Sequence, residues 1–225
     1  QTLQDWQTEV QEALQLASKH ISLYQLTIEK GTPFYSLHKK GAFQLPSEDV
    51  AADMYEWTNQ YLSQHGYNRY EISNYAYKGE ESIHNLTYWH YEEYIGIGAG
   101  AHSRVHNQDG IEAVMMINSP QKWHDSIMKY GNAVQSRIKL SSRDIIKEYI
   151  MMSTRLKTGL NENDFYAITG KNFTEILDQN KFSMYQEQGF ITLSYNNLIL
   201  KDKGLALHNY IIAQLLKDEI FINNP

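Results

Sequence analysis

The 225-residue chain contains no cysteine, only four prolines and no long apolar run. Without cysteine, these residues can form no disulfide, thiolate metal site or thiol nucleophile. No apolar run approaches the roughly 18 residues that a membrane-spanning helix needs, and no signal-like segment is present, so we expect a cytoplasmic protein. The formal net charge of −6 gives no basic field, which argues against extended contact with nucleic acid or an anionic membrane.

Apolar residues, by contrast, are plentiful. Hydrophobic residues make up 42% of the chain and aromatic residues 12%, which is enough for a sizeable core and for one or two domains. The chain begins at Gln1 rather than at methionine and enters a helical pattern at once. We therefore expect residues upstream of this segment to be missing.

The first part of the chain alternates predicted helices and strands. Residues 3–20 have apolar residues at helical spacing, and residues 21–28 predict a strand with apolar residues on both faces, which is typical of a covered, parallel strand. Ser47 is a typical N-cap for a helix over residues 48–64, and residues 70–75 predict a second strand. This alternation indicates β/α units, in which sites collect beyond the carboxyl ends of the strands.

A hairpin and a further helix are expected next. Residues 103–107 and 111–117 have strand character and flank Asp-Gly at 109–110, which favours a tight turn. Residues 119–130 begin with Ser-Pro, a typical helix start. Residues 131–140 lack periodicity, so we place a domain boundary there.

The expected fold is therefore an α/β domain over residues 1–135 followed by a mostly helical domain over residues 136–225. In the second domain, helices, a small hairpin and a last helix suggest a winged-helix-like module. Acidic residues on the expected helix over 173–187 make a poor phosphate surface and argue against DNA binding. The expected elements of this domain are helices near 142–157, 161–168, 173–187 and 204–216, with hairpin strands at 190–193 and 198–200.

The stretch from Ser82 to His106 is the candidate functional region. It combines aromatic residues with several histidines and with glycines at alternate positions. Alternate glycines indicate close approach by a ligand or by another part of the backbone, and a ring-rich flank suits a flat, partly apolar ligand. The histidines are His84, His90, His102 and His106, and the glycines are Gly96, Gly98 and Gly100.

The glycines fit the loose dinucleotide pattern G-x-G-x-x-G/A, but the residues that follow predict a strand where that motif needs a helix. A glycine strand packed against a neighbour, without a ligand, is the other interpretation. His102 and His106 would share a face only on a helix, which makes their spacing weak evidence for zinc. His84 and His102 could converge on a metal or on haem iron, or each could be a hydrogen-bonded structural histidine.

Five segments resemble one protein family in order along nearly the whole chain. The sequence resembles the oxygen-independent coproporphyrinogen III oxidase family of radical S-adenosylmethionine (SAM) proteins, and its H-N-x-x-Y-W motif points to the haem chaperone (HemW-like) branch. The segments are H-I-S-L-Y-Q-L-T-I-E-K-G-T-P at 20–33, Y-E-I-S-N-Y-A at 70–76, H-N-L-T-Y-W at 84–89, Y-I-G-I-G-A-G-A-H-S at 94–103 and the tail from E-Y-I-M-M to I-I-A-Q-L-L.

This resemblance implies that the chain is the C-terminal part of a radical SAM β/α barrel followed by an accessory domain. The family holds a 4Fe-4S cluster through a C-x-x-x-C-x-x-C motif, which lies outside these residues. The motif match implies a haem-associated role for His84, Asn85, Tyr88 and Trp89, with His84 as the possible iron ligand and His102 as the next candidate. The expected SAM-side residues are Gln25, Gly96, Gly98 and Gly100.

Three functional hypotheses follow from the resemblance. The first is a haem-binding chaperone that delivers haem to haem-accepting proteins, with SAM and the cluster bound by the full-length parent. The second is the oxidative decarboxylation of two propionates of coproporphyrinogen III in porphyrin biosynthesis. The third is a structural fragment that binds nothing alone. We expect the segment by itself to be catalytically inactive and to self-associate, as a homodimer, through strands that have lost their barrel neighbours.

Overall fold

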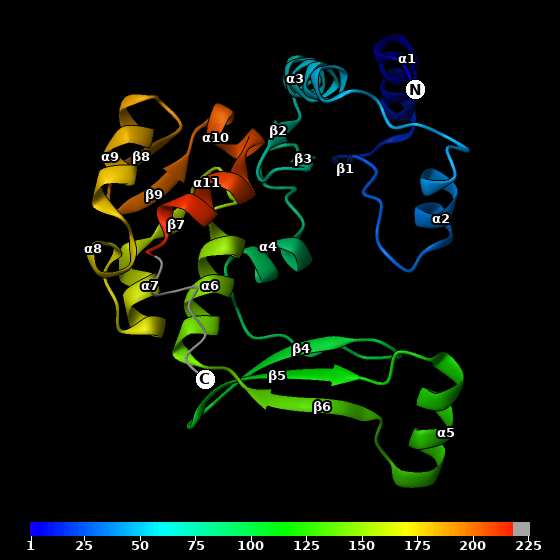
Figure 1. Cartoon of the computed structure of the whole chain (residues 1–225), viewed down its shortest axis with the longest axis vertical. Helices are drawn as coiled ribbons and strands as arrows, with labels where there is room; N and C mark the ends of the chain where they lie inside the picture. Colours follow the sequence, from blue (N-terminus) through cyan, green and yellow to red (C-terminus); the bar gives the residue numbers. More distant parts are fainter. Residues whose placement is uncertain (218–225) are drawn as a thin grey trace. The chain divides into compact units, whose positions relative to one another are not determined.

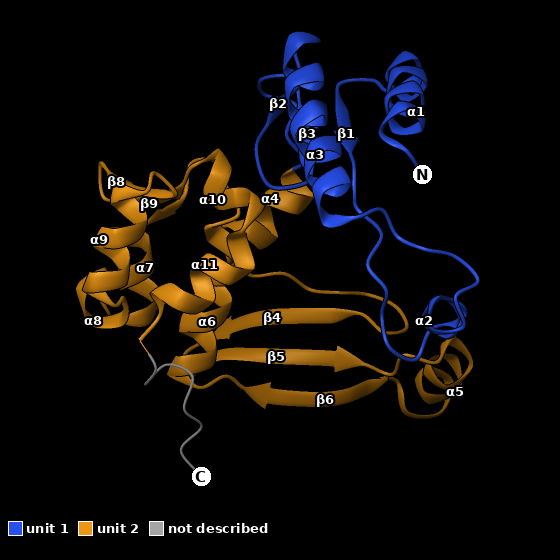
Figure 2. Ribbon diagram, turned by 45° about the horizontal axis from the view of Figure 1, so that its top comes forward, with its two compact units in different colours: residues 1–82 blue, residues 83–225 orange. Residues whose placement is uncertain are grey.

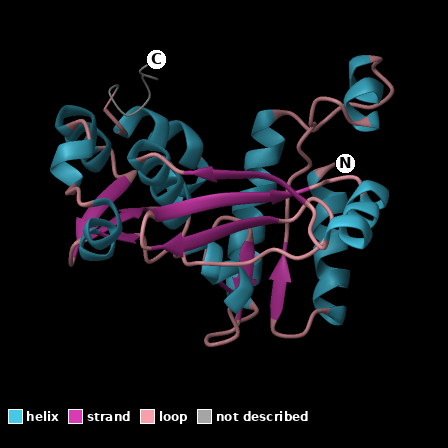
Figure 3. Cartoon of the chain, turned by 90° about the horizontal axis from the view of Figure 1, so that it is seen from below, coloured by secondary structure: helices cyan, strands magenta, loops and turns pink. Residues whose placement is uncertain are grey.

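The computed structural model describes residues 1–217 and divides the chain into two compact units, one ending at Ser82 and the other beginning at Ile83 (Figure 2). Within the described residues the fold is mixed α/β, with eleven helices and three small sheets (Figures 1 and 3). Each sheet has three strands, and every strand pair is antiparallel. None of the described helices is long and apolar enough to cross a lipid bilayer.

Unit 1 packs two helices beside a small sheet of strand order β1-β3-β2. The helix predicted from Ser47 is present with the expected bounds, and the Ser47 hydroxyl accepts a hydrogen bond from the Val50 N–H. The first helix ends earlier than predicted, because Ala17 adopts an extended conformation before the first strand. The elements are α1 (Leu3–Leu16), β1 (His20–Ser22), α2 (Pro33–Lys39), α3 (Glu48–Gln64), β2 (Asn68–Arg69) and β3 (Asn74–Ala76).

The strand predicted over residues 21–28 as a covered, parallel strand is wrong in both length and direction. β1 stops at Ser22 and pairs antiparallel with β3, with Ile21 opposite Tyr75. Leu23 still donates its N–H to the Ser73 carbonyl, but β3 offers no strand residue before Asn74. The chain therefore has no partner on which to continue the ladder, and the apolar residues that follow leave the sheet.

The second predicted strand, over residues 70–75, is also shorter than expected. Glu71 is fully buried, and its carboxylate accepts hydrogen bonds from the Ser73 N–H and the Asn74 side-chain amide at 2.6 Å each. These bonds hold a bend before β3 where a strand was predicted. The apolar core of unit 1 forms around Val10, Leu62 and Tyr75, which joins α1 and α3 to the sheet.

Unit 2 begins with a helix and a second sheet of order β4-β5-β6. The predicted hairpin is confirmed, with Asn107 opposite Gly110 at the turn, and so is the Ser-Pro helix, capped by Ser119. Figure 1 shows α5 at one end of the sheet. The elements are α4 (Ile83–Trp89), β4 (His102–Asn107), β5 (Gly110–Met116), α5 (Pro120–Tyr130) and β6 (Val134–Lys139).

The segment in which we expected a domain boundary forms β6, which pairs with β5. Along the chain, the boundary between the two compact units instead falls after Ser82. The division at residue 135 therefore stays a prediction about the family's domains. The absence of periodicity in this segment has a physical reason, since β6 is an edge strand whose residues are mostly exposed on both faces.

The rest of unit 2 is mostly helical, with a small sheet of order β7-β9-β8. The predicted hairpin is present, but the helix predicted over 173–187 is two helices, because Leu177 is extended and Asp178 caps a new helix. The predicted last helix is likewise interrupted at Leu207. The elements are α6 (Ser142–Ser153), β7 (Leu160–Asn161), α7 (Glu162–Thr169), α8 (Phe173–Ile176), α9 (Gln179–Glu187), β8 (Ile191–Ser194), β9 (Asn197–Leu200), α10 (Asp202–Ala206) and α11 (His208–Leu215).

Candidate functional site

The H-N-L-T-Y-W motif forms helix α4, at the start of unit 2. His84 and Tyr88 are four residues apart and therefore lie on one face of the helix. Their rings meet edge-on, with centroids 4.8 Å apart and planes at 86°. His84 is exposed, and within residues 1–217 its ring makes no hydrogen bond. An imidazole nitrogen of His84 is thus open to a ligand.

A second edge-on contact continues from Tyr88 to Tyr94. Their ring centroids lie 4.5 Å apart with planes at 79°. Tyr94 is itself held by an isolated antiparallel bridge to Arg104 on β4, in which each residue donates its N–H to the other's carbonyl at 3.0 Å. The rings of His84, Tyr88 and Tyr94 therefore form a row of successive edge-on contacts. The backbone of Tyr94, the last residue of this row, is hydrogen-bonded to strand β4.

Trp89 anchors the C-terminal end of α4 to residues of α6 and just beyond. Its carbonyl accepts a hydrogen bond from the Ser153 hydroxyl at 2.7 Å, and the Arg155 guanidinium lies 4.5 Å from the centre of its indole ring. The indole N–H is buried, and it donates no hydrogen bond among the described residues. The exposed end of α4 that carries His84 and the anchored end that carries Trp89 thus have different environments.

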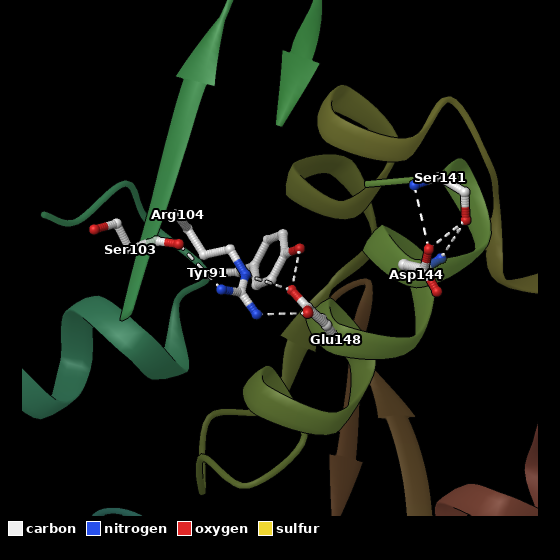
Figure 4. A network of polar contacts seen from close by, with 6 residues as sticks. All are labelled: Tyr91, Ser103, Arg104, Ser141, Asp144 and Glu148. Carbon is white, nitrogen blue, oxygen red and sulfur yellow. Dashed lines mark hydrogen bonds and ion pairs between the residues drawn. The ribbon is translucent and has the colours of Figure 1, made fainter. Parts of the chain in front are cut away.

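An ion pair lies beside this helix (Figure 4). The Arg104 guanidinium donates two hydrogen bonds to the Glu148 carboxylate, at 2.8 and 2.7 Å, and the Tyr91 hydroxyl donates a third at 2.9 Å. Burial, followed by the nearby Glu148 charge, raises the pKa of Tyr91 well above its usual range. Tyr91 also stacks on Tyr149, with ring centroids 5.0 Å apart. These bonds join the chain after α4 to strand β4 and helix α6.

The glycine segment is not the strand that we expected. Gly98 and Gly100 have φ angles of 110° and 72°, where a side chain would be strained, and the segment turns instead of extending. Gly96 has no room for a side chain, because a Cβ there would lie 2.1 Å from the His102 carbonyl oxygen. Backbone geometry alone accounts for all three glycines, and their assignment to the SAM side stays a prediction.

The other candidate residues occupy separate positions. His102 lies exposed on β4 opposite Met115, and no ring contact joins it to His84 within the part of the chain that the structure describes. Asn85 is half-buried on α4. Gln25 lies in unit 1, where its side-chain amide donates to the Ala51 carbonyl at 2.9 Å.

Gln25 lines a cavity of about 420 Å³ in unit 1. Aromatic and aliphatic side chains make up much of the wall, including Trp6, Phe43 and Tyr75. The hydroxyl of Thr58, another lining residue, is already used, since it accepts from the Trp6 indole at 2.7 Å and donates to the Met54 carbonyl at 2.6 Å. Among residues 1–217, no lysine, arginine or histidine lines this cavity and Glu48 does, so it is unsuited to an anionic group such as a carboxylate.

The donor groups present decide which cofactors these residues fit. The chain has no cysteine, so its residues do not fit an iron-sulfur cluster of the thiolate-bound kind. No group of three or more histidine and carboxylate side chains that could hold a metal ion occurs among residues 1–217. A single open imidazole beside aromatic rings does fit haem, which needs only one or two axial ligands and an apolar surface.

Reasoning from the sequence named His84, Tyr88 and Trp89 as candidates, whereas the contacts of Tyr94, Arg104 and Glu148 beside them became visible only in the structure. One signal was available for Glu148. On α6 it lies beside the buried stripe of the helix, formed by Ile146, Tyr149, Ile150 and Ser153, and a carboxylate at the border of such a stripe indicates a polar partner. The sequence offers no comparable signal that would pair it with Arg104.

Known proteins match this chain along nearly its whole length. The family described as HemN C-terminal domain matches residues 140–207. The heme chaperone HemW of Escherichia coli is 34% identical over 218 residues, which cover 97% of this chain and 55% of that protein. HemW of Lactococcus lactis is 33% identical, covering 98% of this chain and 56% of that protein. The bovine mitochondrial radical S-adenosyl methionine domain-containing protein 1 is 30% identical, with coverages of 94% and 49%.

A solved structure supports the fold. The coproporphyrinogen III oxidase (HemN) from Escherichia coli, described as a radical SAM enzyme, superposes with a TM-score of 0.72 over 95% of this chain and 51% of that chain, at 18% sequence identity. The chain spans about half the length of the curated relatives that it matches. The chain belongs to the HemN-like family of radical SAM proteins.

Proposed function

We propose that the protein of which this chain spans about half binds haem and delivers it to haem-accepting proteins, as a haem chaperone. The observation that carries this proposal is the exposed His84 ring, which has no hydrogen bond among the described residues and lies edge-on to Tyr88 on α4. Four relatives named heme chaperone HemW, 31% to 34% identical over 96% to 98% of this chain, support the same conclusion.

In this proposal each motif residue has a separate task. His84 is the axial ligand, because haem iron binds a neutral imidazole nitrogen that is free of other partners. Tyr88 supports the imidazole and supplies aromatic surface for the porphyrin. Trp89 fixes the helix through its carbonyl and its indole ring, and Asn85 lies between these residues on α4. His102 is the next candidate ligand.

The test is the haem Soret band of the full-length protein and of this chain, titrated with haem. We expect His84→Ala to shift the band and weaken binding. His90→Ala is the matched control, because His90 is also exposed and follows the same helix. An unchanged spectrum and affinity in His84→Ala would remove His84 as the ligand, and His102→Ala would then be tested.

An oxidase is the second candidate, favoured by the fold shared with the coproporphyrinogen III oxidase (HemN) structure. Full-length protein should be assayed for protoporphyrinogen formation and for stoichiometric haem uptake in parallel. Product formation with turnover would favour the oxidase, whereas uptake of one haem without product would favour the chaperone. Under both proposals the full-length protein binds SAM and a 4Fe-4S cluster, with Gln25, Gly96, Gly98 and Gly100 on the SAM side.

This chain by itself should bind no iron-sulfur cluster. Reconstitution with iron and sulfide should leave it colourless near 400 nm, because it offers no thiolate. We also propose a cytoplasmic location, as expected for bacterial chaperones of this kind, although four relatives similar to this chain are named mitochondrial. Light scattering on the isolated chain tests the proposed homodimer.

A further inference from the structure

The orientation of His84 depends on a row of contacts that leads away from the exposed surface. An exposed histidine normally samples several rotamers, and each immobilised side chain costs binding free energy when a ligand must order it. His84 contacts Tyr88 edge-on at 4.8 Å, and Tyr88 contacts Tyr94 edge-on at 4.5 Å. The position of the first ring is therefore limited by the second, and that of the second by the third.

Tyr94 has a firmer attachment than the two rings before it. Its backbone exchanges two hydrogen bonds of 3.0 Å with Arg104, and the Arg104 side chain is held by the bidentate pair with Glu148. Both charged side chains are largely shielded, with exposed fractions of 18% and 26%. A bidentate, partly buried pair has a fixed geometry, so the Tyr94 backbone has little freedom to move.

The turn that leads to Tyr94 has a second attachment to the same carboxylate. Tyr91, three residues before Tyr94, donates its hydroxyl to the same Glu148 carboxylate at 2.9 Å (Figure 4). The turn between α4 and Tyr94 is thus tied to Glu148 from both sides, through Tyr91 and through Arg104. The ring of Tyr94 is half-buried, and no hydrogen bond to its hydroxyl is present within residues 1–217. Its ring, rather than its hydroxyl, makes the contact with Tyr88.

We propose that Tyr94 is a positioning residue for His84, which sets the orientation of the imidazole through Tyr88 and is itself held by the Arg104–Glu148 ion pair. The expected effect on haem affinity rests on the proposed function. The ring contacts that orient His84 do not rest on it, since they are present without a ligand. The row pre-organises the histidine, so that a porphyrin iron meets an imidazole already oriented.

The test compares Tyr94→Leu, which removes the ring, with Tyr94→Phe, which removes only the unbonded hydroxyl. The first readout needs no haem and is the NMR resonance of the His84 ring protons, which we expect the ring current of the neighbouring Tyr88 to shift from ordinary values. We expect Tyr94→Leu to move these resonances towards those of a freely exposed histidine and Tyr94→Phe to leave them in place. The His90 resonances, outside the row, are the internal control.

The second readout is haem affinity in the full-length protein. An aromatic pair contributes about 0.5–1.5 kcal/mol beyond its buried area, which corresponds to a loss of about 2- to 12-fold in affinity for Tyr94→Leu. Tyr94→Phe should bind haem as the wild type does. Glu148→Gln keeps the size of the side chain, and we expect it to shift the His84 resonances in the same direction as Tyr94→Leu but less.

The two readouts separate failure of the inference from failure of the proposed function. If the wild type binds no haem while Tyr94→Leu still moves the His84 resonances, the positioning role stands and the haem function fails. If Tyr94→Leu and Glu148→Gln both leave the His84 resonances unchanged in a folded protein, the positioning role is refuted, whatever the haem affinity. If Tyr94→Leu does not fold, Glu148→Gln decides the question, because unchanged His84 resonances in that variant refute the positioning role.

Discussion

Unit 1 and unit 2 differ in how completely they bury apolar side chains. In the 82 residues of unit 1, six hydrophobic residues are buried, whereas 22 are buried in the described part of unit 2, which ends at residue 217. Both units leave some large apolar residues exposed, such as Leu16 at 90% in unit 1 and Ile97 at 90% in unit 2, so the difference lies in the buried residues. Since burial of apolar area is the main stabilising contribution, unit 2 has the core of an independent domain and unit 1 has much less of one.

The two units also use polar groups differently. In unit 1, buried Glu71 and Asn74 hold a bend before β3, and a cavity is lined by aromatic, aliphatic and amide side chains and by Glu48. In unit 2, the Arg104–Glu148 pair holds the turn after α4, and the candidate ligand His84 is exposed on the surface. The two units thus differ in where their polar groups lie, since unit 1 places them against its sheet and around a cavity, whereas unit 2 places them at the turn after α4 and on its exposed face.

The largest expected effect tests whether unit 2 has its own core. Phe165 is fully buried and contacts Tyr149 and Phe173 through its ring. We expect Phe165→Ala to lower the free energy of unfolding of unit 2 by about 3–5 kcal/mol, through lost transfer energy and the remaining cavity. Denaturant unfolding measures this. Tyr166→Ala is the matched control, since Tyr166 is 53% exposed and should cost little.

The corresponding test in unit 1 concerns the join between α1 and α3. The Trp6 indole donates to the buried Thr58 hydroxyl at 2.7 Å. Thr58→Val keeps the shape but removes the acceptor, and an unpaired donor costs about 1–3 kcal/mol. We expect a lower denaturant midpoint of unfolding for Thr58→Val than for the wild type, and tryptophan fluorescence measures it. Thr8→Val, which removes an exposed hydroxyl on α1, is the control, and an equal loss in both variants would contradict this account.

Two glycine substitutions separate crowding from backbone strain in the candidate site. Gly96→Ala would place a Cβ against the His102 carbonyl, and we expect a loss of about 1–3 kcal/mol in unfolding free energy. Gly98→Ala meets no atom within 4 Å, so only its positive φ is penalised, at about 1 kcal/mol. Equal costs in thermal unfolding would mean that the close approach at Gly96 relaxes.

The smallest expected effect concerns two helix caps, that of α1 in unit 1 and that of α8 in unit 2. Hydrogen bonds, from Thr2 in one case and from Asn172 and Lys171 in the other, lower the pKa values of Asp5 and Glu175. Because both folded values lie below the unfolded ones, each carboxylate stabilises its helix above the ordinary range, near pH 4, and this stabilisation is lost as the pH falls through the folded pKa. NMR titration of both carboxyl carbons measures the shifts. Ordinary midpoints at both sites would contradict the caps.

Local sequence rules predicted those elements whose ends are defined by neighbouring residues. Ser47 correctly predicted the start of α3, and Ser119 with Pro120 correctly predicted the start of α5. The Asp-Gly turn correctly predicted the hairpin of β4 and β5. The same rules failed for the glycine segment, where alternate spacing predicted a strand and the backbone turns. In the candidate site, the motif identified His84 and Tyr88, but neither their helical conformation nor their contact was predicted.

The sequence by itself determined the starts of α3 and α5, the hairpin of β4 and β5, the lack of thiolate ligands among these residues and the family, because each of these depends on residue type or on spacing over a few positions. Only the tertiary structure decided the antiparallel direction of β1, the bridge from Tyr94 to Arg104 and the ion pair of Arg104 with Glu148. Arg104 and Glu148 lie 44 residues apart in the sequence. Such contacts depend on the path of the chain between the partners, which a rule about neighbouring residues does not specify.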